Sequence, residues 1–299
     1  MNTPDYFQVD VFASTSLNGN GLSVFPQAEH WDAERMQAIT REMRQFESIF
    51  LMHANPNGAE ARIFTVEEEL PFAGHPLLGA AAVLHRIFKA DEPQASWQIR
   101  LQERSVEVFS TQLEKQRQTK LDEKRSTYYS CTMNQGKPQI GPVLARSSLS
   151  KVLRSLSLYE TDLVTELPAR VISTGLDYLI LPVTPAALER TKICSTSLES
   201  ELTELGAKFV FVVDITNKEI RTWDNLGQVE DVATGSAIGP ALAYLVHQGL
   251  ANISERITWR QGRFVHRPSK LLTWMDQQNQ VWVSGEVWPF ATGSIDAEI

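Results

Sequence analysis

The chain has 299 residues, of which 42% are apolar and 21% charged, and its formal net charge is −8. This length predicts about two domains, and the composition is that of a globular protein that can bury a large core without disulfides or metals. The acidic balance argues against nucleic acid as a partner, because nucleic-acid binding depends on clustered Lys and Arg. The sequence contains no run of 18 apolar residues, so it predicts no membrane-spanning helix. The N-terminus does not resemble a signal peptide, and we therefore expect a cytoplasmic protein.

The first part of the chain alternates predicted strands with helices. A strand is predicted at Tyr6–Phe12, where Phe7, Val9 and Val11 alternate with polar residues. Further strands are predicted at Leu22–Phe25, Glu47–Met52, Ala61–Thr65, Trp97–Leu101 and Val106–Phe109. One helix should run from an N-cap at Asp32 to about Arg44. A second, at 77–88, is apolar nearly all round, which predicts burial on most sides.

The second part repeats this order after a charged segment. Residues 112–126 have few apolar side chains and predict an exposed hairpin or a crossing between halves. Strands are then predicted at Val171–Ser173, Tyr178–Val183, Lys208–Asp214, Glu219–Trp223, 256–265 and 280–288. Thr196–Glu204 should be helical, and an apolar helix at 238–250 matches the one at 77–88 in kind and position. We therefore expect an α+β protein of two similar halves, 1–118 with a C-terminal strand near 280–290, and 119–279.

Two turns at the starts of the apolar helices could bind an anion. One is Gly74-His75, and the other is Thr234-Gly235-Ser236 after Asp231. Unpaired N–H groups at a helix N-terminus favour an anion, and glycine lets a ligand approach the backbone. A local capping turn would use the same residues. If the two helix starts face one another across a cleft, together they could hold the carboxylate of a small acid without a metal.

Glu47 is the candidate acid/base group, because it lies among apolar neighbours where a helix gives way to a strand. An apolar setting disfavours the charged form of a carboxyl group and suits proton transfer near neutral pH. A solvent-facing glutamate at a strand start is the simpler alternative. The sequence shows no motif for a metal site or a disulfide framework. The six His do not have the spacing of zinc ligands, and Cys131 and Cys194 form no metal or disulfide pattern. The glycines match neither a phosphate loop nor a dinucleotide fingerprint, and Ser236 lies in no nucleophile elbow.

The sequence resembles the phenazine-biosynthesis PhzF family, which shares the diaminopimelate-epimerase fold. The resemblance covers most of the chain. It is carried by VDVF at 9–12, GN at 19–20, FES at 46–48, FTVEEELPFAGHP at 64–76, EDVATGSA at 230–237, QG at 261–262 and RPS at 267–269.

The resemblance implies two halves, each a sheet around a central helix, and it places these helices at 76–88 and 237–248. It also implies a homodimer without cofactor or metal. It implies that Glu47, His75 and Asp231 are catalytic. It implies that Asn20, Gly74, Thr234, Gly235 and Ser236 bind a small carboxylate substrate. The best-known activity of the family is the isomerisation of trans-2,3-dihydro-3-hydroxyanthranilate. Related racemases use two cysteines at the helix starts, and neither cysteine of this chain occupies such a place.

The sequence also departs from the family pattern at Trp223, Asp224 and Val232. If Trp223 and Asp224 line the cleft, the substrate need not be the phenazine precursor. The main hypothesis is a cofactor-independent isomerase that moves a proton on a small carboxylate substrate. The alternatives are an amino-acid epimerase or racemase that uses carboxylate and His in place of two thiols, and a non-catalytic protein that binds a small acid.

Overall fold

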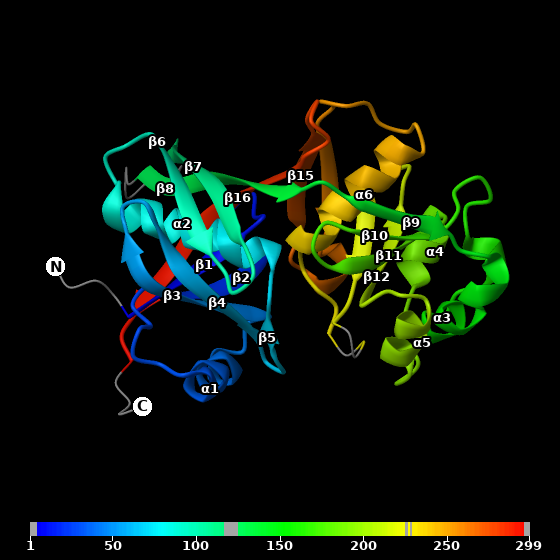
Figure 1. Cartoon of the computed structure of the whole chain (residues 1–299), viewed down its shortest axis with the longest axis horizontal. Coiled ribbons are helices and arrows are strands. Elements are labelled where there is room, and N and C mark those ends of the chain that lie inside the picture. The colour runs from blue at the N-terminus through cyan, green and yellow to red at the C-terminus, as the bar shows by residue number, and fades with distance from the viewer. Residues whose placement is uncertain (1–4, 117–124, 225–226, 228, 296–299) are drawn as a thin grey trace. The chain divides into compact units, whose positions relative to one another are not determined.

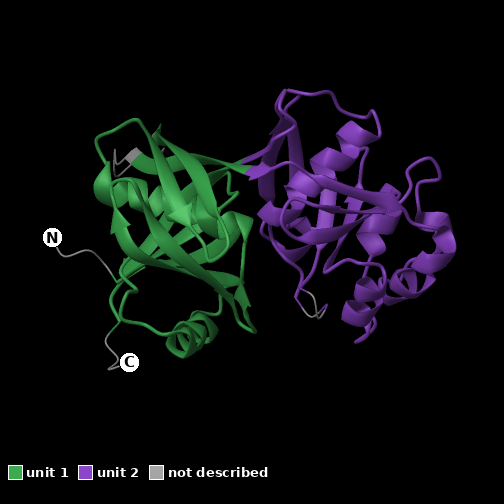
Figure 2. Ribbon diagram, viewed as in Figure 1, with its two compact units in different colours: residues 1–134, 284–299 green, residues 135–283 purple. Residues whose placement is uncertain are grey.

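The computed structural model describes residues 5–116, 125–224, 227 and 229–295. It contains two compact units (Figures 1 and 2). Unit 1 comprises 1–134 and 284–299, and unit 2 comprises 135–283. The chain passes from unit 1 into unit 2 within strand β8 (Arg125–Gly136) and returns within strand β16 (Val281–Gly293).

Unit 1 is a ring of strands around one helix. Its strands are β1 (Tyr6–Val11), β2 (Asn20–Phe25), β3 (Glu47–Asn55), β4 (Gly58–Thr65), β6 (Gln94–Arg100), β7 (Ser105–Gln116), β8 and β16. They pair in that order, and β16 also pairs with β1, which closes the ring. Helix α2 (Gly74–Phe88) contacts β1, β2, β3, β6 and β7. Its residues from Gly74 to His85 are all buried, as the apolar sequence predicts.

The central helix packs closely against the strands. A Cβ added at Gly79 would lie 2.3 Å from Leu22 Cδ2 and 3.2 Å from Val9 Cγ2, so glycine lets the helix approach β1 and β2. The short strand β5 (Glu69–Leu70) pairs with β4. Helix α1 (Ala33–Met43) begins at Asp32, whose side chain accepts a hydrogen bond from Arg35 N, and packs outside the ring on a separate apolar cluster.

Unit 2 is a second sheet with its own central helix. Its strands follow the order β16, β15 (Ser269–Met275), β14 (Ile257–Gln261), β13 (Glu219–Thr222), β12 (Phe209–Asp214), β11 (Asp177–Pro182), β10 (Arg170–Ser173) and β9 (Gln139–Val143). Helix α6 (Gly235–His247) contacts β10, β11 and β15. Helices α3 (Ser150–Ser155), α4 (Pro185–Arg190) and α5 (Leu198–Glu204) pack on an apolar cluster of this unit. Short 3-10 turns lie at Arg146–Leu149, Glu160–Asp162 and Arg263–Val265.

Several element boundaries differ from those that the sequence predicts. Helix α2 begins at Gly74 instead of residue 76, because a proline in the first turn needs no N–H partner. Helix α6 begins at Gly235 instead of 237. The strand predicted at 256–265 ends at Gln261, because Gly262 turns the chain with φ of 80°. The segment β15 was not predicted as a strand.

The charged segment 112–126 belongs partly to two paired strands. Strand β7 extends to Gln116 and β8 begins at Arg125, and they pair from Val108–Met133 to Gln116–Arg125. Residues 117–124 lie outside the described residues. Because β8 continues in unit 1 as far as Asn134, the chain divides at 134/135 and 283/284 instead of at the predicted 118/119 and 279/280.

Candidate active site

The predicted site residues form two groups, one in each unit. In unit 1, Glu47 is the first residue of β3, where the strand pairs with Leu22 of β2 and Thr65 of β4. Its side chain is buried, and the whole residue is 5% exposed. The alternative of a solvent-facing glutamate is therefore wrong. Its carboxyl oxygen Oε2 lies 3.3 Å from His75 Nδ1.

His75 is the second residue of α2, and the N-cap Ala73 has no side chain that could cap the helix. The imidazole is buried, and burial lowers the pKa of His75 to about 3. The ring is therefore neutral at pH 7, and its contact with Glu47 is one between a carboxyl group and a neutral imidazole rather than an ion pair. The other ring nitrogen, Nε2, has no hydrogen-bond partner within the described part of the chain.

Asn20 and Gly74 complete this group in unit 1. Asn20 is the buried first residue of β2 and pairs with Val11 of β1. It follows Gly19, which has a φ of 69°. A Cβ added at Gly19 would lie only 2.4 Å from the carbonyl oxygen of Val11. A side chain at residue 19 would not fit, so the glycine sets the path by which Asn20 enters the strand. Gly74 is the first, buried residue of α2.

The buried, neutral His75 predicts a specific loss of stability in acid. Above about pH 6.5 the imidazole is neutral in both the folded and the unfolded chain. Between pH 6.5 and about 3 the unfolded chain binds a proton that the folded one does not, so the free energy of unfolding falls as the pH is lowered. Between pH 7 and 5 the free energy of unfolding should fall by about 2 kcal/mol less in His75→Gln than in the wild type. Urea unfolding at the two pH values measures this difference. His53→Gln, at an exposed position, is the control and should behave as the wild type. An unchanged pH dependence in His75→Gln would contradict the prediction.

In unit 2, the segment before α6 is held by its own hydrogen bonds. Thr234 Oγ1 donates to Asp231 Oδ2 at 2.5 Å, and Ala233 N donates to Asp231 Oδ1 at 3.3 Å. Gln261 of β14 accepts from Thr234 N at 2.9 Å and donates to Asp231 O and Thr234 Oγ1, both at 2.9 Å. The carboxylate, the turn and the strand behind them are therefore one connected group.

Two further buried side chains hold the first turn of α6. Gln135 Nε2 donates to the carbonyl oxygen of Gly235 at 2.7 Å, and Gln135 Oε1 accepts from Thr174 Oγ1 at 3.2 Å. The hydroxyl groups of Tyr178 and Ser236 lie 2.7 Å apart. Helix α6, like α2, has no side-chain N-cap bond. In an α-helix the first N–H groups have no partner within the helix, which suits an anion.

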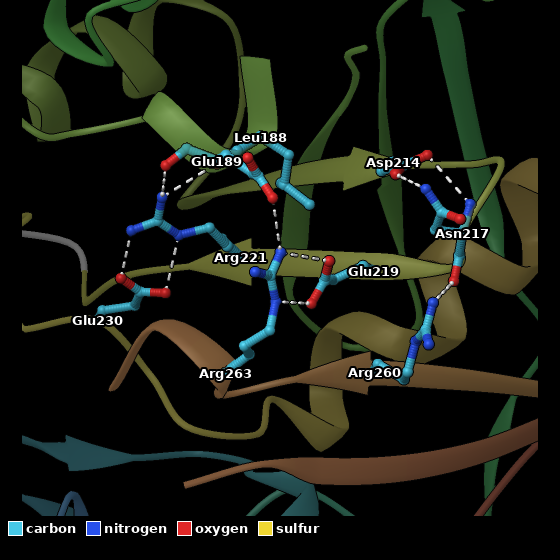
Figure 3. Close-up of polar contacts among 9 residues, drawn as sticks. All are labelled: Leu188, Glu189, Asp214, Asn217, Glu219, Arg221, Glu230, Arg260 and Arg263. Carbon is cyan, nitrogen blue, oxygen red and sulfur yellow. Dashed lines mark hydrogen bonds and ion pairs between the residues drawn. The ribbon is translucent and has the colours of Figure 1, made fainter. Parts of the chain in front are cut away.

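Sequence reasoning did not identify the residues that support these groups. In the sequence, Gln261 stands out only as part of the QG motif at 261–262, and no local pattern marks Gln135 or Tyr178 as a site residue. Their importance depends on contacts across the fold. Arg221 of β13 was also missed: it forms a bidentate ion pair with Glu230 through bonds of 2.9 and 2.6 Å, directly before Asp231 (Figure 3).

The departures at Trp223 and Asp224 have local structural explanations. The Trp223 side chain belongs to the apolar cluster of unit 2, and the residue is 6% exposed. Its backbone forms an isolated antiparallel β-bridge with Glu230. Asp224 closes a turn, since its backbone N–H donates to Val229 O and its carboxylate accepts from Val229 N. The bulk of Trp223 therefore fills the core of this unit.

Neither cysteine lies at a helix start. Cys131 is buried on β8, where burial raises the pKa of its thiol, and Cys194 is exposed between α4 and α5. Among the described residues, no three His, Cys, Asp or Glu side chains gather in a way that could hold a metal ion. No helix in the described ranges is long and apolar enough to cross a membrane.

Comparison with known proteins confirms the resemblance. Residues 9–293 match the family PhzC-PhzF, described as phenazine biosynthesis-like protein. The trans-2,3-dihydro-3-hydroxyanthranilate isomerase of Pseudomonas chlororaphis is 28% identical and aligns over 97% of this chain and 98% of its own. A Pseudomonas aeruginosa structure described as a predicted epimerase is 44% identical with a TM-score of 0.89, and the match covers 99% of this chain and 100% of that one. A probable proline racemase from Agrobacterium radiobacter, 12% identical with a TM-score of 0.63 over 99% and 94% of the two chains, shares the fold. The chain belongs to the PhzC-PhzF family and is an isomerase with the diaminopimelate-epimerase-like fold.

Proposed function

We propose that the protein moves a proton between two carbon atoms of a small carboxylate substrate, with Glu47 as the acid/base group. The observation that carries this proposal is the buried Glu47 carboxyl group, 3.3 Å from a neutral imidazole at the start of a central helix. A buried carboxyl group that is held in place by a neighbour suits general acid/base catalysis. The name of the Pseudomonas chlororaphis relative supports a carboxylate-bearing cyclic diene as the substrate class.

The proposed reaction is redox-neutral. The carboxylate of Glu47 takes a proton from one carbon of the substrate, and the electron pair of the broken C–H bond forms a new C=C bond to the neighbouring carbon. The π electron pair of the adjacent double bond shifts at the same time to its far carbon. The carboxyl group then returns the proton to another carbon, which restores the ionised Glu47. In this proposal His75 holds Glu47 in position, and Asp231 orients and polarises the substrate. From the family resemblance we also propose Asn20, Gly74, Gly235, Ser236 and the Thr234 turn as substrate-binding residues.

We also propose an oligomeric state, a cellular compartment and independence from cofactors for the enzyme. A homodimer that works in the cytoplasm, without a metal or an organic cofactor, is supported by the family resemblance. Light scattering of the purified protein tests the homodimer, and a mass near that of one chain would contradict it. Dialysis against EDTA tests the independence from metals, and we expect turnover to be unchanged.

A second candidate is epimerisation of an amino acid, which the predicted epimerase from Pseudomonas aeruginosa favours at 44% identity. Both reactions begin when a base removes a carbon-bound proton. They differ in the carbon that receives the proton, because an epimerase returns it to the carbon from which it came.

Incubation in D2O separates the two reactions. The substrates would be trans-2,3-dihydro-3-hydroxyanthranilate and a panel of free amino acids, with deuterium located by NMR. For the isomerase we expect a product with shifted double bonds, and deuterium that Glu47 exchanges with the solvent should lie on a carbon other than the one that loses its proton. Deuterium at the α-carbon of an amino acid would instead support the epimerase. Binding of these acids without any exchange would contradict both and support a non-catalytic binding protein.

A further inference from the structure

We propose that Gln261 and Thr234 form a hydrogen-bond relay that holds the Asp231 carboxylate in one orientation, a role that rests on the function proposed above. Thr234 is then a positioning residue for Asp231, and its side chain does not donate to the substrate. Gln261, which has no assigned role, becomes a positioning residue of the same site. Both residues and Asp231 belong to unit 2.

Two backbone groups fix the orientation of the Gln261 amide. Its Oε1 lies 2.9 Å from Thr234 N, and its Nε2 lies 2.9 Å from Asp231 O. A backbone N–H can only donate and a backbone carbonyl can only accept. The amide oxygen must therefore face Thr234 N, and the amide nitrogen must face Asp231 O.

This orientation determines where the hydroxyl hydrogen of Thr234 points. Gln261 Nε2 also lies 2.9 Å from Thr234 Oγ1, and because the amide nitrogen is a donor, the hydroxyl oxygen accepts this bond. The hydroxyl hydrogen is then directed at Asp231 Oδ2, 2.5 Å away. An O–H donor to an ionised carboxylate makes a short, strong hydrogen bond. The relay thus runs in one direction, from the amide through the hydroxyl to the carboxylate.

Burial strengthens the relay. Gln261 is 2% exposed and Asp231 4%, and polar contacts are stronger where water is excluded. The second carboxyl oxygen of Asp231 accepts from Ala233 N, so both oxygens are engaged by the turn. The backbone amide of Thr234 is used by Gln261 as well, which leaves Thr234 no donor for a ligand.

The next residue explains how Gln261 reaches the turn. Gly262 has a φ of 80°, and a Cβ there would lie 2.1 Å from Arg267 O and 2.8 Å from Val232 O. Ser269 Oγ donates to the same Val232 carbonyl at 3.2 Å. The strand end and the Asp231 turn are therefore in direct backbone contact, which places the amide of Gln261 within reach.

Two ion pairs near the turn involve neither Gln261 nor Thr234. Glu230 pairs with Arg221 of β13, and Arg263, beyond Gly262, pairs with Glu219 (Figure 3). Arg267 donates its backbone N–H to Gly262 O. Variants at Gln261 and Thr234 remove neutral groups only, so they leave these charges unchanged.

A matched set of variants tests the relay without a substrate. Thr234→Val removes the hydroxyl at nearly constant shape, Thr234→Ser keeps it, and Gln261→Leu removes the amide. The probe is the 13C NMR signal of the Asp231 carboxyl group in protein labelled with 13C-aspartate, followed against pH. We expect this signal to titrate about one pH unit higher in Thr234→Val and Gln261→Leu than in the wild type, because the carboxylate loses a donor. Thr234→Ser should titrate as the wild type.

Turnover provides the second readout. A carboxylate that is free to rotate loses its alignment, so kcat of Gln261→Leu should fall about 10²-fold with KM little changed. Thr234→Ser, which keeps the hydroxyl group, should lose less of kcat than Thr234→Val. If Gln261→Leu does not fold, Gln261→Asn, whose shorter amide does not span the gap, replaces it. Asp231 titrating as in the wild type in folded Thr234→Val and Gln261 variants would overturn the relay. Absence of turnover in the wild type would count against the proposed function, and the titration would still decide the relay.

Discussion

We expect Glu47→Gln to lower kcat by roughly 10²–10⁴-fold, the range that a positioned acid/base group contributes. The amide of glutamine has nearly the shape of the carboxyl group and keeps a polar atom beside His75 Nδ1. It cannot take a proton from carbon. Because the substitution adds no volume at a buried position, the fold and KM should change little. Turnover in D2O, followed by NMR, measures the loss.

Two further variants separate chemistry from folding. Glu60→Gln changes a carboxyl group on β4 that pairs with Arg100 at the surface, and should retain wild-type turnover. Glu47→Asp keeps the carboxylate but withdraws it by one methylene group, so we expect activity between those of Glu47→Gln and the wild type. A folded Glu47→Gln with kcat within fivefold of the wild type would remove Glu47 from the mechanism.

Local sequence predicted the elements that carry the candidate site. The apolar, alanine-rich segments after Gly74 and Gly235 indicated two buried central helices, and the structure has both. The apolar surroundings of Glu47 indicated a desolvated carboxyl group, and the side chain is buried. These features depend on patterns within a few neighbouring residues, which a single sequence displays. The assignment of the catalytic and binding roles remains a prediction.

The supporting contacts could not be predicted, because each joins segments far apart in the chain. Gln261 reaches the backbone of Asp231 and Thr234 only because β14 ends beside their turn. Trp223 was considered a candidate for the cleft from its departure from the family pattern, and the structure places it in the apolar core of unit 2. A substitution relative to a family shows that a position has changed, but its surroundings decide what the change affects.

Breaking the ion pair of Arg221 with Glu230 should destabilise unit 2 strongly, because both side chains are almost buried. The side chains of Arg221 and Glu230 are 9% and 10% exposed. Arg221 Nη1 also donates to the carbonyl oxygen of Leu188 in α4 at 3.0 Å (Figure 3). The same nitrogen donates to the carbonyl oxygen of Thr191, directly after α4, at 2.7 Å. Arg221→Met would leave a buried carboxylate without its partner and two carbonyls without a donor. We expect the free energy of unfolding to fall by about 3–5 kcal/mol, measured by urea unfolding with tryptophan fluorescence.

Arg263 provides the matched control for this prediction. It also forms a bidentate contact, with Glu219, but its side chain is 52% exposed. Water competes for such a pair, so Arg263→Met should cost no more than about 1 kcal/mol. The double variant Arg221→Met with Glu230→Leu removes both charges and should recover much of the loss, because the unpaired buried carboxylate is its main cause. Equal stabilities of Arg221→Met and Arg263→Met would show that the buried pair does not hold the segment before Asp231.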